Sequence, residues 1–265
     1  MKRWIASLRD AVVFLVLYAV AQYVCIFLAG IISVDDPAPT VVPGQRIAVV
    51  SACGSLLAVA AVAVYRRIVY GRGCAMMHSK QGFDPRVLLW GVVLLAAVSI
   101  VIDPMLSHLP VADQNYGRGG WTLLSVVIVA PVAEELLFRG LLLEMFRRHM
   151  GTVAAVVLSS VVFALMHMQP AVMIDAFLAA LVLCYIYLLT RSIYACILLH
   201  IFNNAIAMSM QVLEYHDKTL AEIVDSSSVY FIVYAAALAV VAVGAMHAAR
   251  TIGHAGGKVK NSAVR

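Results

Sequence analysis

Two adjacent glutamates and an arginine lie inside a long apolar segment of the chain. The segment reads P-V-A-E-E-L-L-F-R-G over residues 131–140 and contains Glu134, Glu135 and Arg139. A charged side chain at the centre of a membrane span costs about 3 kcal/mol or more unless it is paired or reaches water. Ionisable residues in such a place therefore predict a functional site.

The two glutamates have different predicted roles. Glu135 precedes Arg139 by four residues, which is the favourable order for an ion pair along one helix face. Glu134 points about 100° away from Glu135 on a helical wheel, so we expect it to face a polar cavity. Pro131 frees the carbonyl of Val127 and favours a kink in polar or watery surroundings. An ion-pair cluster that only locks helices together would explain Glu135 and leave Glu134 without a role.

Two further polar pairs follow on the next predicted helices. Phe163 and His167 are four residues apart, as are His200 and Asn204, so each pair shares one helix face. A lone histidine in a membrane helix more often makes a packing hydrogen bond than it does chemistry. If the helices before and after Gly151 form an antiparallel hairpin, however, His167 lies at the depth of the two glutamates. The sequence therefore predicts that the first two motifs meet.

The depth of the third motif needs one more assumption. Residue counts from the cytoplasmic ends of the helices place His200 about 10 Å closer to the cytoplasmic surface than Glu134 and His167. This difference disappears if the tip of the hairpin stands out as a helix in the cytosol. Among the other ionisable residues, Asp175 is expected to be structural, and His149 and His247 are given no role.

Composition predicts the kind of element that must position these residues. Hydrophobic residues make up 63% of the chain and charged residues 12%, and the mean hydropathy is +0.95. Soluble domains carry about 25% charged residues. We therefore predict an all-α, polytopic transmembrane helical bundle. The net charge of +5 is scattered over short loops, which argues against a nucleic-acid-binding patch.

Apolar runs of about 20 residues, the length needed to cross a bilayer, predict about eight spans. They cover residues 11–34, 47–65, 87–102, 121–146, 152–168, 171–190, 193–215 and 229–249. We expect a single transmembrane domain over residues 1–250, with its catalytic core in residues 121–215. Residues 251–265 are expected to form a disordered basic tail in the cytoplasm.

The distribution of basic residues predicts the orientation. Most of the 19 Lys and Arg residues lie on the side of the two termini, whereas Arg46, Arg118 and Lys218 lie on the other side. Cytoplasmic loops carry the excess of Lys and Arg in membrane proteins. Both termini are therefore expected in the cytoplasm. The short loops and the alanine- and valine-rich spans indicate a bacterial cytoplasmic membrane.

The three motifs together carry a family resemblance. The patterns E-E-x-x-x-R at 134–139, F-x-x-x-H at 163–167 and H-x-x-x-N at 200–204 occur in this order on separate predicted helices. In this they resemble the CPBP family, which comprises the CAAX prenyl endopeptidases and the bacteriocin-processing and abortive-infection proteins. Each motif alone is weak, but three in order are fairly specific.

The resemblance implies an intramembrane glutamic endopeptidase that cuts a membrane-associated protein or peptide. Glu134 would be the general base that activates a water, and His167 would position this water. His200 and Asn204 would form the oxyanion hole. The residues that would support the site are Glu135, Arg139 and Phe163.

A metal is the alternative to a metal-free site. Glu134, His167 and His200 provide one carboxylate and two imidazoles, a ligand set that catalytic zinc uses. The chain has no H-E-x-x-H pattern. A Glu134 ligand would also leave only Glu135 as a base, and Glu135 is predicted to pair with Arg139. We therefore favour no cofactor, as the resemblance also suggests, with zinc as the alternative.

Two other functions are compatible with polar residues inside membrane spans. A non-catalytic relative that regulates membrane proteins by binding them, or acts as an immunity factor, would be supported by degenerate motifs, but every motif position is filled here. A transporter predicts inverted repeats, which the sequence does not display. The expected partners are the lipid bilayer and a peptide or membrane-protein substrate. The eukaryotic relatives remove three residues after a prenylated cysteine, whereas the bacterial relatives are linked to peptide maturation, immunity or regulation.

Overall fold

The computed structural model describes residues 2–33, 43–71, 76–109, 119–215, 218–224 and 226–262. This part of the chain is mainly helical and contains no β-strand, only an isolated antiparallel bridge between His78 and Ser192. The chain divides into two compact units: unit 1 comprises Met1–Met76 and Asp113–Met150, and unit 2 comprises Met77–Ala112 and Gly151–Arg265. The predicted all-α fold is confirmed, whereas the predicted domain boundaries stay a prediction.

Six helices of the described chain are long and apolar enough to cross a membrane. They are α1 (Lys2–Ser33), α2 (Pro43–Tyr70), α3 (Pro85–Leu106), α8 (Pro170–Thr190), α9 (Ile193–Val212) and α11 (Ser227–Ser262). Each contains most of a predicted span. The other two predicted spans correspond to the continuous helical run 120–149 and to the shorter helix α7 (Thr152–Leu165). The protein is therefore a multi-pass membrane protein.

Helix boundaries follow local signals. Asp84 caps α3, because its carboxylate accepts a hydrogen bond of 2.9 Å from the backbone N–H of Arg86. Proline occupies the first turn of α8, and Arg191 ends that helix in the left-handed conformation with φ 53°. α11 continues to Ser262, beyond the predicted end of its span and through most of the segment expected to be disordered. No proline follows Ser227 to stop it.

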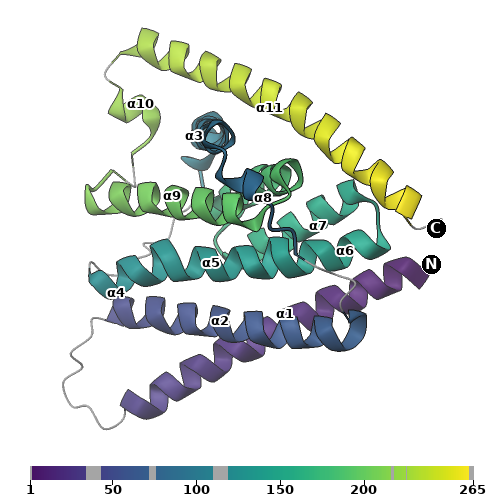
Figure 1. The fold of residues 1–265 in the computed structure, drawn as a ribbon. Helices are drawn as coiled ribbons and strands as arrows, with labels where there is room; N and C mark the ends of the chain where they lie inside the picture. The colour runs from purple at the N-terminus through teal and green to yellow at the C-terminus, as the bar shows by residue number, and fades with distance from the viewer. Residues whose placement is uncertain are drawn as a thin grey trace. The chain divides into compact units, whose positions relative to one another are not determined.

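In unit 1, α1 crosses α2 obliquely (Figure 1). Both helices also contact the continuous helical run 120–149. Gln22 donates to the hydroxyl of Ser55 at 3.2 Å. Gly54 permits this approach, because a Cβ there would lie 2.3 Å from the Gln22 side-chain oxygen. The rings of Phe14 and Phe138 meet edge to face at 5.2 Å. Unit 1 therefore holds the Phe138 region of the run against α1.

The run 120–149 alternates between α- and π-helical turns. Its segments are α4 (Gly120–Leu123), η2 (Leu124–Val129), α5 (Ala130–Glu135), η3 (Leu136–Leu143) and α6 (Glu144–His149), of which η2 and η3 are π-helical. The N–H of Ala130 donates to the carbonyl of Ser125, five residues earlier. Pro131 then lies at the start of α5, directly after the π-helical segment η2 and within the continuous run. π-helical turns are frequent at functional sites.

In unit 2, the segment before α3 braces the turn between α8 and α9. The N–H of Ser79 donates to the carbonyl of Arg191 at 2.8 Å, and the N–H of Ile193 donates to that of Met77 at 2.9 Å. The 3-10 turn η1 (Lys80–Phe83) follows, and the short helix α10 (Leu220–Ile223) precedes α11. α3 approaches α9 closely at Gly91, where a Cβ would lie 2.4 Å from Leu199. These contacts fix the part of α9 that carries the third motif.

Candidate active site

The predicted ion pair of the first motif is confirmed. Arg139 donates to a carboxylate oxygen of Glu135 at 2.6 Å, and the two side chains are 1% and 0% exposed. Removing one partner of such a buried pair leaves an uncompensated charge, which typically costs about 3–5 kcal/mol. The pair therefore constrains this turn of the run strongly, whereas its role in supporting catalysis stays a prediction.

Glu134 has a different environment from its neighbour. Its side chain is half-buried, whereas that of Glu135 is fully buried. Within unit 1 it interacts electrostatically with the phenol of Tyr18 on α1, and this phenol also interacts with Gln22 and Ser55. Glu134 therefore faces polar groups of unit 1, whereas Glu135 forms the buried ion pair with Arg139.

The second motif differs from the prediction in its backbone. α7 ends at Leu165, so His167 lies in the turn after the helix, not inside a helix that continues to Met168. The helix stops because Met168 adopts a left-handed φ of 62° and Gln169, which precedes Pro170, is extended. A methionine in the left-handed region is strained, and such strain often marks functional sites.

Phe163 brings the second and third motifs together in unit 2. Its ring centroid lies 4.9 Å from that of His167 and 5.9 Å from that of His200. Phe163 is 3% exposed and His200 is 7% exposed, so this aromatic cluster is well packed. A ring in contact with both imidazoles holds the two histidines at a defined separation.

The hydrogen bond of His167 determines its neutral tautomer. Nδ1 lies 3.0 Å from the backbone carbonyl oxygen of Phe163. A carbonyl only accepts, so Nδ1 carries the proton and Nε2 presents a lone pair. Nε2 is thus able to accept a hydrogen bond from a water or to bind a metal.

The remaining predicted residues are placed only in part. Asn204 is half-buried and lies one turn after His200 on α9, as predicted. Glu134 belongs to unit 1, whereas His167 and His200 belong to unit 2, so their meeting stays a prediction. Within the described residues of either unit, no three His, Cys, Asp or Glu side chains gather to hold a metal ion. The zinc alternative combines residues of both units and stays a hypothesis.

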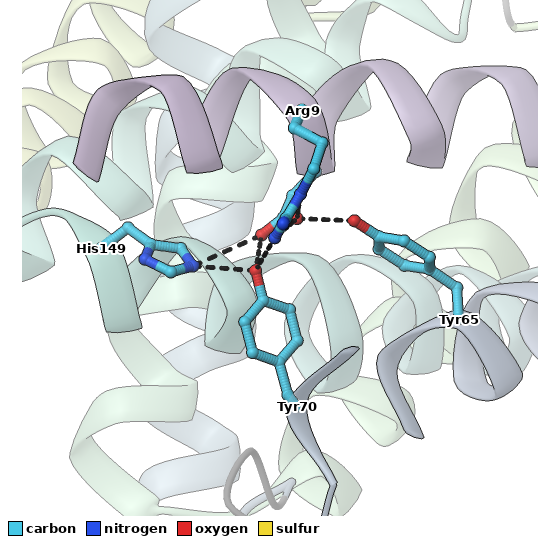
Figure 2. A network of polar contacts seen from close by, with 5 residues as sticks. Arg9, Tyr65, Tyr70 and His149 are labelled. Atoms are coloured by element: carbon cyan, nitrogen blue, oxygen red, sulfur yellow. Dashed lines mark hydrogen bonds and ion pairs between the residues drawn. The ribbon is translucent and has the colours of Figure 1, made fainter. Parts of the chain in front are cut away.

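A buried carboxylate at the start of α1 was missed in the sequence. Asp10 is 0% exposed and forms the centre of a polar network in unit 1 (Figure 2). It accepts hydrogen bonds from the phenols of Tyr65, at 2.8 Å, and Tyr70, and pairs with Arg9 at 2.9 Å. His149 lies 3.6 Å from the carboxylate and hydrogen-bonds the Tyr70 phenol at 2.8 Å. The sequence contains one signal for this network, because the charged pair Arg9-Asp10 stands just before the long apolar run that begins at Ala11.

This network packs the predicted hairpin tip against the rest of unit 1. Met145 and Phe146 of α6 are fully buried, and His149 ties the end of α6 to α1 and α2. Arg148 adds a cation–π contact, with its guanidinium 5.3 Å from the Tyr70 ring centroid. α6 is therefore packed within unit 1 and does not stand alone. Its depth relative to the bilayer stays a prediction.

Asp175 has two polar neighbours within unit 2. It accepts a hydrogen bond of 3.5 Å from Ser99 and interacts electrostatically with His167 in unit 2. Asp175 is expected from the sequence to be structural, and this assignment stays a prediction.

Comparison with known families now adds to the geometry. Residues 118–206 match the family model described as type II CAAX prenyl endopeptidase, Rce1-like. This segment is similar to the CAAX endopeptidases. No curated protein and no solved structure matches the chain. The match confirms the resemblance inferred from the three motifs, and it supports peptide hydrolysis within the membrane. The CAAX-endopeptidase-like segment, residues 118–206, contains every predicted site residue from Glu134 to Asn204.

Replacing Phe163 tests the aromatic cluster of the CAAX-endopeptidase-like segment. We expect Phe163→Leu to shift the imidazole NMR signals of both His167 and His200, because it removes the ring packed on each. The lost aromatic contacts are worth about 1 kcal/mol each. Phe146→Leu is the matched control, since Phe146 is also fully buried but lies in unit 1. Unchanged histidine signals in Phe163→Leu would contradict this arrangement.

Replacing Asp10 tests the polar network. Asp10→Asn leaves one acceptor for two phenols and removes the charge that faces Arg9. We expect it to lower the free energy of unfolding in detergent by about 2–3 kcal/mol. Arg9→Gln is expected to have a smaller effect, because the Arg9 side chain is 47% exposed and water screens its charge. Equal thermal unfolding of Asp10→Asn and the wild type would show that the network contributes no stability.

Proposed function

We propose that the protein is an intramembrane glutamic endopeptidase that hydrolyses a peptide bond of a membrane-associated protein or peptide. The observation that carries the proposal is the family match over residues 118–206, which includes all three motifs. The ring contacts of Phe163 with His167 and His200 support it, because they join two motifs far apart in the sequence.

In the proposed first step, Glu134 removes a proton from a water whose oxygen attacks the carbonyl carbon of the peptide bond. The ion pair of Glu135 with Arg139 supports this choice of base, since it gives Glu135 a structural role, whereas Glu134 is half-buried and interacts with the phenol of Tyr18. His167 holds the water through Nε2, which its Nδ1–H bond to the Phe163 carbonyl leaves as an acceptor. General bases of this kind contribute about 10²–10⁴-fold to the rate.

In the second step, the carbonyl oxygen becomes an oxyanion that His200 and Asn204 stabilise as donors. The intermediate collapses as the C–N bond breaks, and the protonated Glu134 returns its proton to the leaving amine. The burial of His200 supports this role, since hydrogen bonds to a developing charge are strongest where water is excluded. No serine or cysteine nucleophile is needed.

The substrate and membrane are also part of the proposal. The described family acts on CAAX prenyl proteins, whereas the composition of the chain favours a bacterial cytoplasmic membrane, where a prenylated substrate is less expected. We therefore propose a membrane-proximal peptide or protein as the substrate class, without requiring a prenyl group. The proposed chemistry uses no metal.

Replacing the proposed base tests the mechanism. We expect Glu134→Gln to lower hydrolysis by about 10²–10⁴-fold with normal folding, and His200→Ala by about 10²–10³-fold. Because the substrate is unknown, the measurement is the set of peptide termini released in cells that carry the wild type or the variant. Glu144→Gln is the matched control, since Glu144 pairs with Arg147 on α6 and has no proposed role in the chemistry. Wild-type cleavage by Glu134→Gln would disprove the mechanism, and identical termini in both cells would favour a non-catalytic binding function.

Measuring the metal content tests the choice between the two mechanisms. We expect purified protein to contain much less than one equivalent of zinc by mass spectrometry and its cleavage activity to resist chelators. One bound equivalent that is lost in His167→Ala, together with chelator-sensitive cleavage, would instead favour zinc held by Glu134, His167 and His200.

A further inference from the structure

A cavity of about 610 Å³ lies in unit 2 between α3, α8 and α11. Its volume is in the range of small-molecule and lipid sites, about 300–1,000 Å³. None of the residues that line it belongs to the three motifs, so the proposed peptidase chemistry does not account for it. Its lining combines apolar side chains with aromatic and charged ones.

A chain of hydrogen bonds links three side chains that line the cavity. The indole N–H of Trp90 donates to the Tyr185 hydroxyl oxygen at 3.1 Å, and this hydroxyl lies 2.6 Å from Nδ1 of His247. Where the Tyr185 hydroxyl donates to Nδ1, the neutral imidazole carries its proton on Nε2, and the imidazolium has a proton there as well. In these two forms His247 is a donor through Nε2.

Arg86 adds a positive charge to the lining. Its backbone N–H is bound by the Asp84 carboxylate at the start of α3, and its side chain is exposed. Asp84 also lines the cavity, and its negative charge disfavours a dianion such as free phosphate more than the monoanion of a phosphodiester. Charge complementarity therefore selects a singly charged phosphate group.

The apolar lining indicates that the ligand is an amphiphile. Val87, Leu189 and Val243 line the cavity, and Val243 is 51% exposed on α11. In a membrane span, such an exposed valine faces lipid chains. The cavity involves the start of α3 and the end of α8, which the Lys and Arg distribution predicts to be cytoplasmic. Trp and Tyr favour this interfacial depth, and basic pockets between spans on this side suit lipid headgroups.

We propose that this cavity binds a phospholipid of the cytoplasmic leaflet. The phosphodiester lies between the guanidinium of Arg86 and Nε2–H of His247, and an acyl chain lies along Val87, Leu189 and Val243. The site is separate in sequence from the motif residues, so it does not depend on the proposed peptidase activity.

Fluorescence of Trp90 tests the proposal directly. The other two tryptophans, Trp4 and Trp121, are more than half exposed, and Trp4→Phe with Trp121→Phe makes Trp90 the only indole of the full chain. Dioleoylphosphatidylglycerol with brominated acyl chains is added to the protein in maltoside micelles, whose headgroups contain no phosphate. We expect saturable quenching of Trp90, with brominated diacylglycerol clearly weaker and inorganic phosphate unable to compete.

Variants distinguish specific binding in the cavity from a general attraction of anionic lipid to basic residues. Arg86→Gln is expected to weaken the binding of the lipid about tenfold, because it removes a charge-assisted hydrogen bond. Val243→Phe should block quenching by filling the cavity from an exposed position that folding tolerates. Arg67→Gln is the matched control, an exposed arginine at the end of α2 in unit 1. Unchanged quenching in Arg86→Gln, equal weakening in Arg67→Gln, or equal binding of diacylglycerol would overturn the proposal.

Discussion

The buried ion pair between Glu135 and Arg139 is the constraint on which the candidate site depends. At 2.6 Å and almost without exposure, it places two opposite charges in an apolar helix where neither charge is stable alone. The surrounding leucines exclude water, and Leu137, Leu142 and Leu143 are fully buried. The pair lies where the π-helical segment η3 begins, and Glu134 lies on a different side of the helix, among polar groups of unit 1. The two neighbouring carboxylates thus have different environments, and the proposed roles of base and scaffold follow this difference.

In unit 2 a single aromatic ring has the corresponding role. Phe163 packs on His167 and His200, and its backbone carbonyl also selects the neutral tautomer of His167. This arrangement requires α7 to end at Leu165, since the histidine folds back onto the last turn of the helix. The strained Met168 and the extended Gln169 before Pro170 make that ending obligatory. Helix termination thus orients the imidazole of His167.

Tyrosine phenols satisfy buried polar groups at the ends of helices in both units. In unit 1, Tyr65 and Tyr70 donate to the Asp10 carboxylate and so stabilise the junction of α1, α2 and α6. In unit 2, Tyr185 links an indole to His247 at the edge of a cavity. In both units, therefore, a tyrosine hydroxyl connects polar side chains of different helices.

The sequence by itself determined the helical membrane fold, the approximate limits of the spans and the ion pair, because hydropathy and a spacing of four residues act within one helix. It also determined the family resemblance, since the motif residues are read in order along the chain. Only the tertiary structure decided that α7 stops before His167, that Phe163 contacts both histidines, and that Asp10 is buried with Tyr65, Tyr70 and His149. Those features depend on side chains from elements far apart in the sequence, and periodicity along a single helix does not specify which of its neighbours will meet it.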